Sequence, residues 1–207
     1  MKIWVTGDCG PATLPAVDRL RIHHDVVVSD ATLDPLDPEQ VTPMVAGVDA
    51  LLHPASIADA CSNEETLDRA ARGAYVVLTE AVKGGVGRAV LVSDLSCFAD
   101  YPSDYVIDET FRPRPNPDAA SLAPLLAERT FREFSRQECI QTLCLRFGSV
   151  DVPGGTPSGM AVDAIDRALT NEIERGTYRS WLFHVADSNS FPLKAAKGKP
   201  LVLGQKP

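Results

Sequence analysis

The chain has 207 residues, of which 44% are hydrophobic and 23% charged, and its formal net charge is −8 at pH 7. This length suits one α/β domain with a sizeable core and is too short for two full domains. The acidic balance excludes a nucleic-acid partner, because phosphate binding needs a basic surface. No run of about 18 apolar residues is present, which excludes a membrane span. The opening residues from Met1 are typical of a strand rather than a secretory signal, so we expect a cytoplasmic protein.

Short apolar runs alternate with longer segments of helical periodicity, a pattern typical of a parallel sheet with crossover helices. Several runs, such as residues 89–92, are apolar without alternation, as strands buried on both faces should be. The predicted strands are residues 2–6, 25–29, 50–53, 88–93, 140–146 and 181–185. The predicted helices are residues 14–20, 38–45, 66–83, 121–137 and 161–175.

Two proline- and glycine-containing stretches, residues 94–120 and 151–159, are predicted to be loops. The chain after Ser188 is weakly patterned. We therefore predict one domain over residues 1–190 and a C-terminal tail over residues 191–207.

The five cysteines are scattered along the chain, and no pair has the Cys-x-x-Cys spacing of a zinc site. They are Cys9, Cys61, Cys97, Cys139 and Cys144. No cluster of His, Asp, Glu and Cys has metal-ligand spacing either, so we expect free thiols and no metal.

Seven segments in order resemble motifs of the extended short-chain dehydrogenase/reductases, in the branch of NAD-dependent epimerases and dehydratases. They are 1–10 (MKIWVTGDCG), 48–55 (VDALLHPA), 72–74 (RGA), 90–93 (VLVS), 126–129 (LAER), 145–150 (LRFGSV) and 181–187 (WLFHVAD). The resemblance implies a Rossmann-like, doubly wound, mostly parallel sheet in three α/β/α layers. The third strand of that fold is missing from the pattern here.

The turn after the first strand is where the resemblance places the cofactor pyrophosphate, on Gly7, Cys9, Gly10, Pro11 and Ala12. Glycines let the backbone approach the phosphates at the start of the following helix. Pro11 and Pro15 remove backbone donors from this region. Thr13 replaces a third glycine, where it either pushes the helix away or caps it, and Asp8 adds negative charge. We expect an NAD site of weakened affinity.

Further cofactor contacts implied by the resemblance lie at strand ends. Asp30 follows the second strand, where a carboxylate bonds a ribose hydroxyl in NAD binders; alternatively it only starts a turn. No nearby Arg or Lys follows it, which disfavours NADP. His53, Pro54 and Ala55 end the next strand, and Asp34 and Asp37 resemble the acidic motif beside the adenine pocket.

The family's catalytic residues are replaced when the motifs are aligned. Ala120 falls on the tyrosine, Pro124 on the lysine, Asp94 on the serine and Ala70 on the helix asparagine. No Tyr-x-x-x-Lys sequence occurs anywhere in the chain, so the usual proton exchange coupled to hydride transfer should be absent.

Two interpretations of the 94–109 loop remain open. Asp94 with Tyr101 or Tyr105 provides groups for non-standard acid–base chemistry, as in an altered NAD-dependent oxidoreductase or epimerase; alternatively the loop is a solvated acidic segment. Glu128 and Arg129 are interpreted as exposed helix charges, and His184 as a strand histidine with its hydrogen bonds satisfied.

The substrate lobe of the family is reduced here to the loop 151–159, so a pocket closed by that lobe should not form. We expect a binding or assembly protein without classical catalysis. In the family, helices equivalent to 66–83 and 121–137 pair with a partner subunit, so the resemblance implies a homodimer. Their apolar stripes also serve to cover the sheet.

Overall fold

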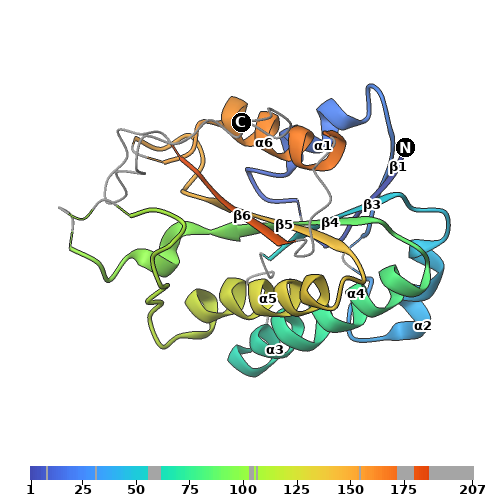
Figure 1. The fold of residues 1–207 in the computed structure, drawn as a ribbon, viewed down its shortest axis with the longest axis horizontal. Helices are drawn as coiled ribbons and strands as arrows, with labels where there is room; N and C mark the ends of the chain where they lie inside the picture. The colour runs from blue at the N-terminus through green and yellow to red at the C-terminus, as the bar shows by residue number, and fades with distance from the viewer. Residues whose placement is uncertain are drawn as a thin grey trace.

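All six strands pair in parallel in one sheet of order β2-β1-β3-β4-β5-β6. The computed structural model describes residues 1–7, 9–30, 32–55, 62–102, 105, 107–153, 155–171 and 180–186. The strands are β1 (Lys2–Val5), β2 (Asp25–Val28), β3 (Ala50–Pro54), β4 (Arg88–Asp94), β5 (Gln141–Phe147) and β6 (Ser180–Val185). Helices lie on both faces of the sheet (Figure 1), which confirms the Rossmann-like three-layer fold.

The helices cover the two faces unequally. They are α1 (Leu14–Leu20), α2 (Pro38–Val41), α3 (Asn63–Asp68), α4 (Ala74–Lys83), α5 (Ala119–Arg136) and α6 (Ser158–Thr170). Helices α1 and α6 lie on one face, and α2 to α5 lie on the other (Figure 1). Each face has its own core: Ile3 and Val5 pack on the α1 and α6 side, while Trp4 packs on the opposite side. Burial on both faces explains the uninterrupted apolar runs of the strands.

The sheet matches the doubly wound order 3-2-1-4-5-6 without the strand beyond β2. Between β2 and β3 the described residues form α2 and a 3-10 turn, Thr42–Val45, and no strand. The predicted loss of the third strand is therefore confirmed for this part of the chain.

Several helix boundaries differ from prediction, including the starts of α5 at Ala119 and of α6 at Ser158. Helix α3 begins at Asn63 rather than residue 66, because Ser62 and Glu65 form a reciprocal capping box. A π-helical turn, Arg69–Gly73, then separates α3 from α4. Helix α6 ends at Thr170, where the guanidinium of Arg88 donates to three carbonyl groups. Residues 172–175, where that helix was predicted to end, and the tail 191–207 lie outside the described residues.

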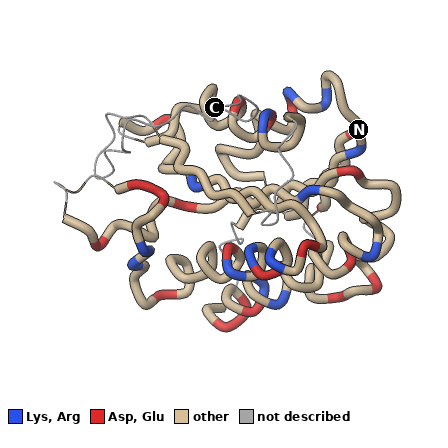
Figure 2. The backbone as a smooth tube through the Cα atoms, viewed as in Figure 1, with Lys and Arg blue, Asp and Glu red and all other residues tan. Residues whose placement is uncertain are grey.

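The buried face of α5 is built mostly from small side chains. Ala123, Ala127 and Phe131 are buried against the sheet, whereas Leu122 and Leu125 are only half-buried. Small residues let α5 approach the strands closely, and Leu122 and Leu125 lie at the edge of the contact between the helix and the sheet. Charged side chains are frequent on the layer formed by α3, α4 and α5 (Figure 2). No helix in the described part of the chain is long and apolar enough to cross a membrane.

Candidate functional site

A cavity of about 780 Å³ lies where β1, β3, β4 and β5 end, the edge at which open parallel sheets bind ligands. Its size is in the range of small-molecule sites. The β1–α1 turn, β4, α5 and the loop after β5 contribute most of the wall. The lining residues are Gly10, Pro11, Ala12, Thr13, Pro54, Ala55, Asn63, Thr66, Val92, Ser93, Asp94, Ser96, Ala119, Ala120, Ser121, Ala123, Pro124, Phe147, Gly148, Ser149 and Val150.

Three of the four aligned catalytic positions meet in this cavity. Asp94 enters from the end of β4, and Ala120 and Pro124 lie one turn apart on α5. Ala70 is buried in the π-helical turn and does not line it. Neither an alanine nor a proline side chain can hold or move a proton, so this wall lacks the two groups that perform proton exchange in the family.

The β1–α1 turn has few backbone donors to offer a phosphate. Gly7 adopts the left-handed conformation with φ +70°, which favours glycine. Pro11 has no N–H, and the N–H groups of Thr13 and Leu14 both donate to the carbonyl of Gly10. Thr13 occupies the N-cap position of α1, as one of the two interpretations has it, but it is buried and its side chain makes no capping hydrogen bond. Asp8 lies outside the described residues.

The side chain of Asp30 is occupied by its own turn. It accepts hydrogen bonds from the backbone N–H and the hydroxyl of Thr32, which lower the pKa of its carboxyl. It does not line the cavity. These contacts are the ones expected if Asp30 only starts a turn. A contact between Asp30 and the ribose of NAD stays a prediction.

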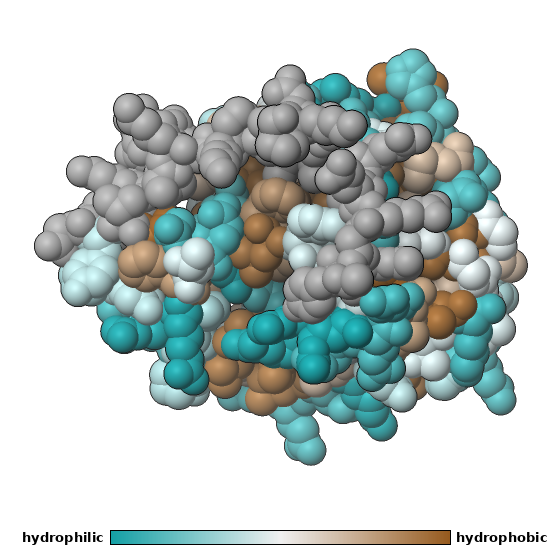
Figure 3. Space-filling model, in the orientation of Figure 1, coloured by the Kyte–Doolittle hydropathy of each residue, from teal (hydrophilic) through white to brown (hydrophobic). Residues whose placement is uncertain are grey.

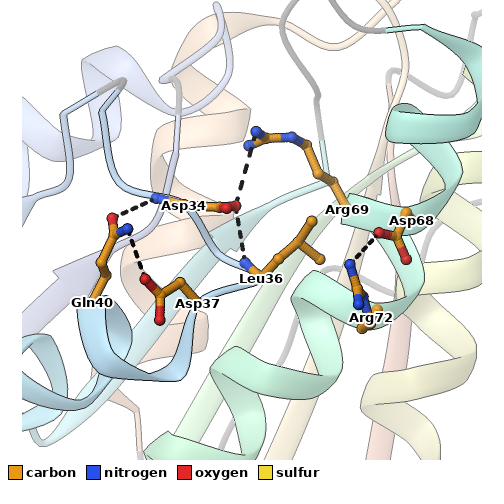
Figure 4. Close-up of polar contacts among 7 residues, drawn as sticks. All are labelled: Asp34, Leu36, Asp37, Gln40, Asp68, Arg69 and Arg72. Atoms are coloured by element: carbon orange, nitrogen blue, oxygen red, sulfur yellow. Dashed lines mark hydrogen bonds and ion pairs between the residues drawn. The ribbon is translucent and has the colours of Figure 1, made fainter.

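Asp34 and Asp37 also bond within their own segment (Figure 4). Asp34 accepts from the N–H of Leu36 and lies 3.9 Å from the guanidinium of Arg69. Asp37 caps α2 and accepts from the side-chain amide of Gln40. Neither aspartate lines the cavity. They fold the segment after β2 against the α3–α4 region, which explains them without an adenine ligand.

His53 faces the protein interior, while its neighbours Pro54 and Ala55 line the cavity. Its ring stacks on Phe131 with centroids 5.5 Å apart. Its Nδ1 is hydrogen-bonded to the Thr6 hydroxyl. Burial lowers the pKa of His53 to about 4. The imidazole is therefore neutral and its described contacts are those of a structural side chain.

The two candidate tyrosines of the 94–109 loop do not line the cavity. Tyr101 donates its hydroxyl proton to the carbonyl of Arg112, and the guanidinium of Arg114 lies 4.5 Å from its ring centre. Tyr105 is 46% exposed. The loop is anchored by a small apolar cluster that includes Phe98 and Ile107, so a purely solvated loop is a wrong description of it. Only Asp94 among the three candidates borders the cavity.

A buried polar network, missed from the sequence, lies behind the cavity wall. Arg146 forms two hydrogen bonds with Glu128, and the Ser93 hydroxyl donates to the same carboxylate at 2.6 Å. Glu128 is 8% exposed, so the interpretation of it as a surface charge is wrong. A signal was present: an arginine inside the apolar strand 140–146 needs a buried partner, and Glu128 follows Pro124 at helical spacing. Arg129 is exposed, as predicted.

His184 lies at the far end of this network. Arg146 Nη1 donates to its Nε2 at 3.3 Å, which places the ring proton on Nδ1. That Nδ1 has no partner among the described residues, so the prediction of a fully satisfied strand histidine is wrong. Burial lowers the pKa of His184 to about 4.

Among the described cysteines, Cys97, Cys139 and Cys144 are free thiols. Burial raises the pKa of Cys97 to about 12 and that of Cys144 well above its usual range. These two thiols are therefore not nucleophiles at neutral pH. Cys61 lies outside the described residues. Within the described ranges no group of His, Cys, Asp and Glu is arranged to hold a metal ion.

The chain resembles solved structures of extended short-chain dehydrogenases in fold. A mutated uronate dehydrogenase is 20% identical with a TM-score of 0.77, covering 100% of this chain and 82% of that one. UDP-N-acetylglucosamine 4-epimerase from Bacillus cereus is 16% identical with a TM-score of 0.76, covering 92% and 80%. A short-chain dehydrogenase/reductase superfamily protein from Agrobacterium tumefaciens, with bound NAD, is 20% identical with a TM-score of 0.65, covering 81% and 58%.

No family model and no curated protein matches the chain. At these identities the likeness shows the fold. The molecule is thus a Rossmann-like α/β protein with the architecture of the epimerase and dehydratase structures, and with a cavity at the edge where such folds bind ligands.

Proposed function

We propose that the protein is a ligand-binding relative of the extended short-chain dehydrogenases that does not perform their tyrosine- and lysine-dependent hydride chemistry. The observation that carries the proposal is the presence of Ala120 and Pro124 in the cavity wall, one helical turn apart. A hydride acceptor or donor needs a proton partner at this place, and neither side chain supplies one.

The proposed ligand of the β1–α1 end of the cavity is NAD, bound weakly. Gly10, Pro11 and Ala12 line that end, which favours a nucleotide there. Against strong binding, Pro11 has no donor, and the N–H groups of Thr13 and Leu14 are used within the turn. Each missing charge-assisted hydrogen bond costs about 1.5–3 kcal/mol, or about 10- to 100-fold in affinity.

The experiment is a calorimetric titration of the protein with NAD and with NADP, followed by a search for hydride transfer at saturating NAD. We expect weak NAD binding without hydride transfer. Hydride transfer at a rate typical of enzymes would contradict the proposal, and loss of that transfer in Asp94→Asn would favour the alternative, an NAD-dependent enzyme in which Asp94 carries the proton. A matched variant, Ala120→Tyr with Pro124→Lys, tests whether the missing pair is what limits chemistry.

We further propose that α4 and α5 form a homodimer interface. A groove of about 580 Å³ runs between them, lined by Tyr75, Thr79, Val82, Lys83, Arg129, Thr130, Glu133, Phe134 and Gln137. Tyr75 is 57% exposed and packs edge-on against Phe134. Hydrophilic and hydrophobic residues both reach the surface on the face that Figure 3 shows. Sedimentation of the wild type and of Tyr75→Glu tests the interface; an unchanged monomer in both would contradict it.

The proposed domain is a single unit over residues 1–190 in which the substrate lobe is reduced to the loop after β5. That loop turns back at once: Val150 pairs with Thr156. The Thr156 hydroxyl accepts from the N–H of Gly148 and bonds the carbonyl of Val185. Residues 191–207 are assigned to a tail.

A further inference from the structure

We propose that β2, at the open edge of the sheet, pairs with β2 of a second copy of this chain, so that two sheets join into one. Strand β2 is an edge strand because the described residues place no strand beyond it, where the doubly wound order has one. The contact is separate from the groove between α4 and α5, to which β2 contributes no residue. It goes beyond the proposed function, since it does not depend on a ligand in the cavity.

The backbone of β2 leaves hydrogen-bonding groups free at this edge. The N–H groups of Asp25 and Ser29 donate to backbone carbonyls on the β1 side, at 3.1 and 2.9 Å. Because backbone groups alternate in direction from one strand residue to the next, Val27 also faces β1, whereas Val26 and Val28 face away from it. No described residue bonds the N–H or C=O groups of Val26 and Val28. Such an open row of donors and acceptors is a template for another strand.

The opposite edge of the sheet is protected, and the β2 edge is not. In β6 the N–H of His184 donates to the carboxylate of Glu109 at 3.0 Å, which blocks an added strand there. Residues 22–30 contain neither proline nor lysine, which often guard sheet edges. The valines 26–28 are only half-buried, and Ile22, in the turn before β2, is 70% exposed. Apolar surface therefore accompanies the free backbone groups.

Two-fold antiparallel pairing uses every free group of the strand. With Val27 opposite the partner's Val27, Val26 of each copy lies opposite Val28 of the other. Residues in such a pair exchange both their N–H···O=C bonds. A register shifted by one residue would set groups that already bond β1 against the new strand, so the alternation of β2 selects this arrangement.

The polar residues at the two ends of the strand agree with the same symmetry. In this register Asp25 lies opposite the partner's Ser29, and Asp30 lies opposite the partner's His24. Neither exposed aspartate therefore faces another acid, and an imidazole opposite a carboxylate is a favourable cross-strand pair. Because β2 complements itself in both hydrogen bonds and charge, as a two-fold interface requires, the occupant of the edge is a second copy.

The experiment uses the full chain with Tyr75→Glu, which disrupts the groove between α4 and α5, so that the β2 contact is measured alone. Amide hydrogen exchange is followed by NMR, and sedimentation by ultracentrifugation, over a range of protein concentrations. We expect dimerisation to slow the exchange of Val26 and Val28 by at least about 10-fold, as one hydrogen bond requires. Val27, which bonds β1, should be protected at every concentration and thereby report that the sheet is folded.

Two variants in the same background test the backbone pairing and the register. Val28→Pro removes an N–H that faces away from β1, a place where edge strands accept proline, and should raise the dissociation constant of the dimer at least about 10-fold. His24→Asp sets an acid opposite the partner's Asp30 and should also weaken the dimer. His23→Asp is the matched control, because it makes the same change one residue further from β2, and it should weaken the dimer less.

Three results would overturn the inference. The first is fast exchange of Val26 and Val28 at every concentration, which would mean that the edge stays open. The second is protection that does not depend on concentration, since another segment of the same chain would then cover the edge. The third is a dimer that Val28→Pro leaves unchanged or that both histidine variants weaken equally. None of these results touches the proposed function, which fails instead on hydride transfer by the wild-type protein.

Discussion

The guanidinium of Arg146 donates to both carboxylate oxygens of Glu128, from Nε at 2.8 Å and from Nη2 at 2.6 Å. Both side chains are less than a tenth exposed. The pair joins α5 to β5, and Ser93 ties it to β4. It thereby joins the helix that carries Ala120 and Pro124 to the sheet beside the cavity.

Removing one partner of this pair should destabilise the fold strongly. Glu128→Ala leaves the Arg146 charge buried and unpaired, and we expect the free energy of unfolding to fall by about 3–5 kcal/mol. Urea denaturation measures it. The control is Glu133→Ala, whose ion pair with Arg136 is more than half exposed on both sides and should be worth less than about 1 kcal/mol. Equal losses in the two variants would contradict the assigned role.

Stability should fall on mild acidification. The pKa values of His53 and His184 are lowered by burial to about 4, from an ordinary 6.5. As the pH falls through 6.5 the unfolded chain gains protons that the folded protein does not bind until about pH 4. Between these values the unfolded state is favoured increasingly, by on the order of 1–2 kcal/mol per histidine at pH 5.

The measurement is the unfolding free energy at pH 7 and pH 5 for the wild type, His53→Gln and the control His23→Gln. His23 is exposed in the turn before β2. We expect His53→Gln to lose part of the acid sensitivity and His23→Gln to retain it. An identical pH dependence in all three proteins speaks against the burial of His53.

Gly155 should not tolerate a side chain. A Cβ built there would lie 1.8 Å from the backbone carbonyl oxygen of Ser149, so the tight loop after β5 would have to open. We expect Gly155→Ala to lower the free energy of unfolding, measured by thermal denaturation, by about 1–3 kcal/mol. Gly159 on α6 has no atom within 4 Å of such a Cβ, and Gly159→Ala should stabilise by about 0.5–1 kcal/mol. A neutral Gly155→Ala would refute the close approach.

Restoring a donor at the β1–α1 turn should strengthen NAD binding. Pro11→Ala returns an N–H to the lining of the cavity, and we expect about a 10-fold tighter dissociation constant by calorimetry. Pro15→Ala is the control, because Pro15 lies at the start of α1, just after this turn, and does not line the cavity. Should both variants bind NAD like the wild type, the turn does not contact the pyrophosphate.

The ends of the strands were predictable to within one residue, because parallel strands that are buried on both faces appear in the sequence as uninterrupted apolar runs. Residues 88–93 became Arg88–Asp94 and residues 181–185 became Ser180–Val185. Helix ends were less predictable. The end of α6 depends on Arg88, some eighty residues away in sequence, and no local signal marks such a contact.

The candidate site was predictable in part. The positions of Asp94, Ala120 and Pro124 in one cavity follow from aligned motifs, since strand ends and a helix start meet at one sheet edge. The turn contacts of Asp30 match one of its two interpretations. The Tyr101 hydroxyl bond to Arg112 and the burial of Glu128 were not predictable. Such contacts depend on which of several possible hydrogen-bond partners lies next to a polar side chain in the folded protein.

The most direct test is to bind NAD to the wild-type protein and, in the same sample, follow hydride transfer to or from a panel of sugars. The account predicts weak, saturable binding of NAD and no hydride transfer at any pH between about 5 and about 8, the range in which proteins tend to be most stable. Transfer at a rate typical of enzymes, on the order of 1 per second or faster, would contradict it, because neither Ala120 nor Pro124 can carry the proton that must move with the hydride.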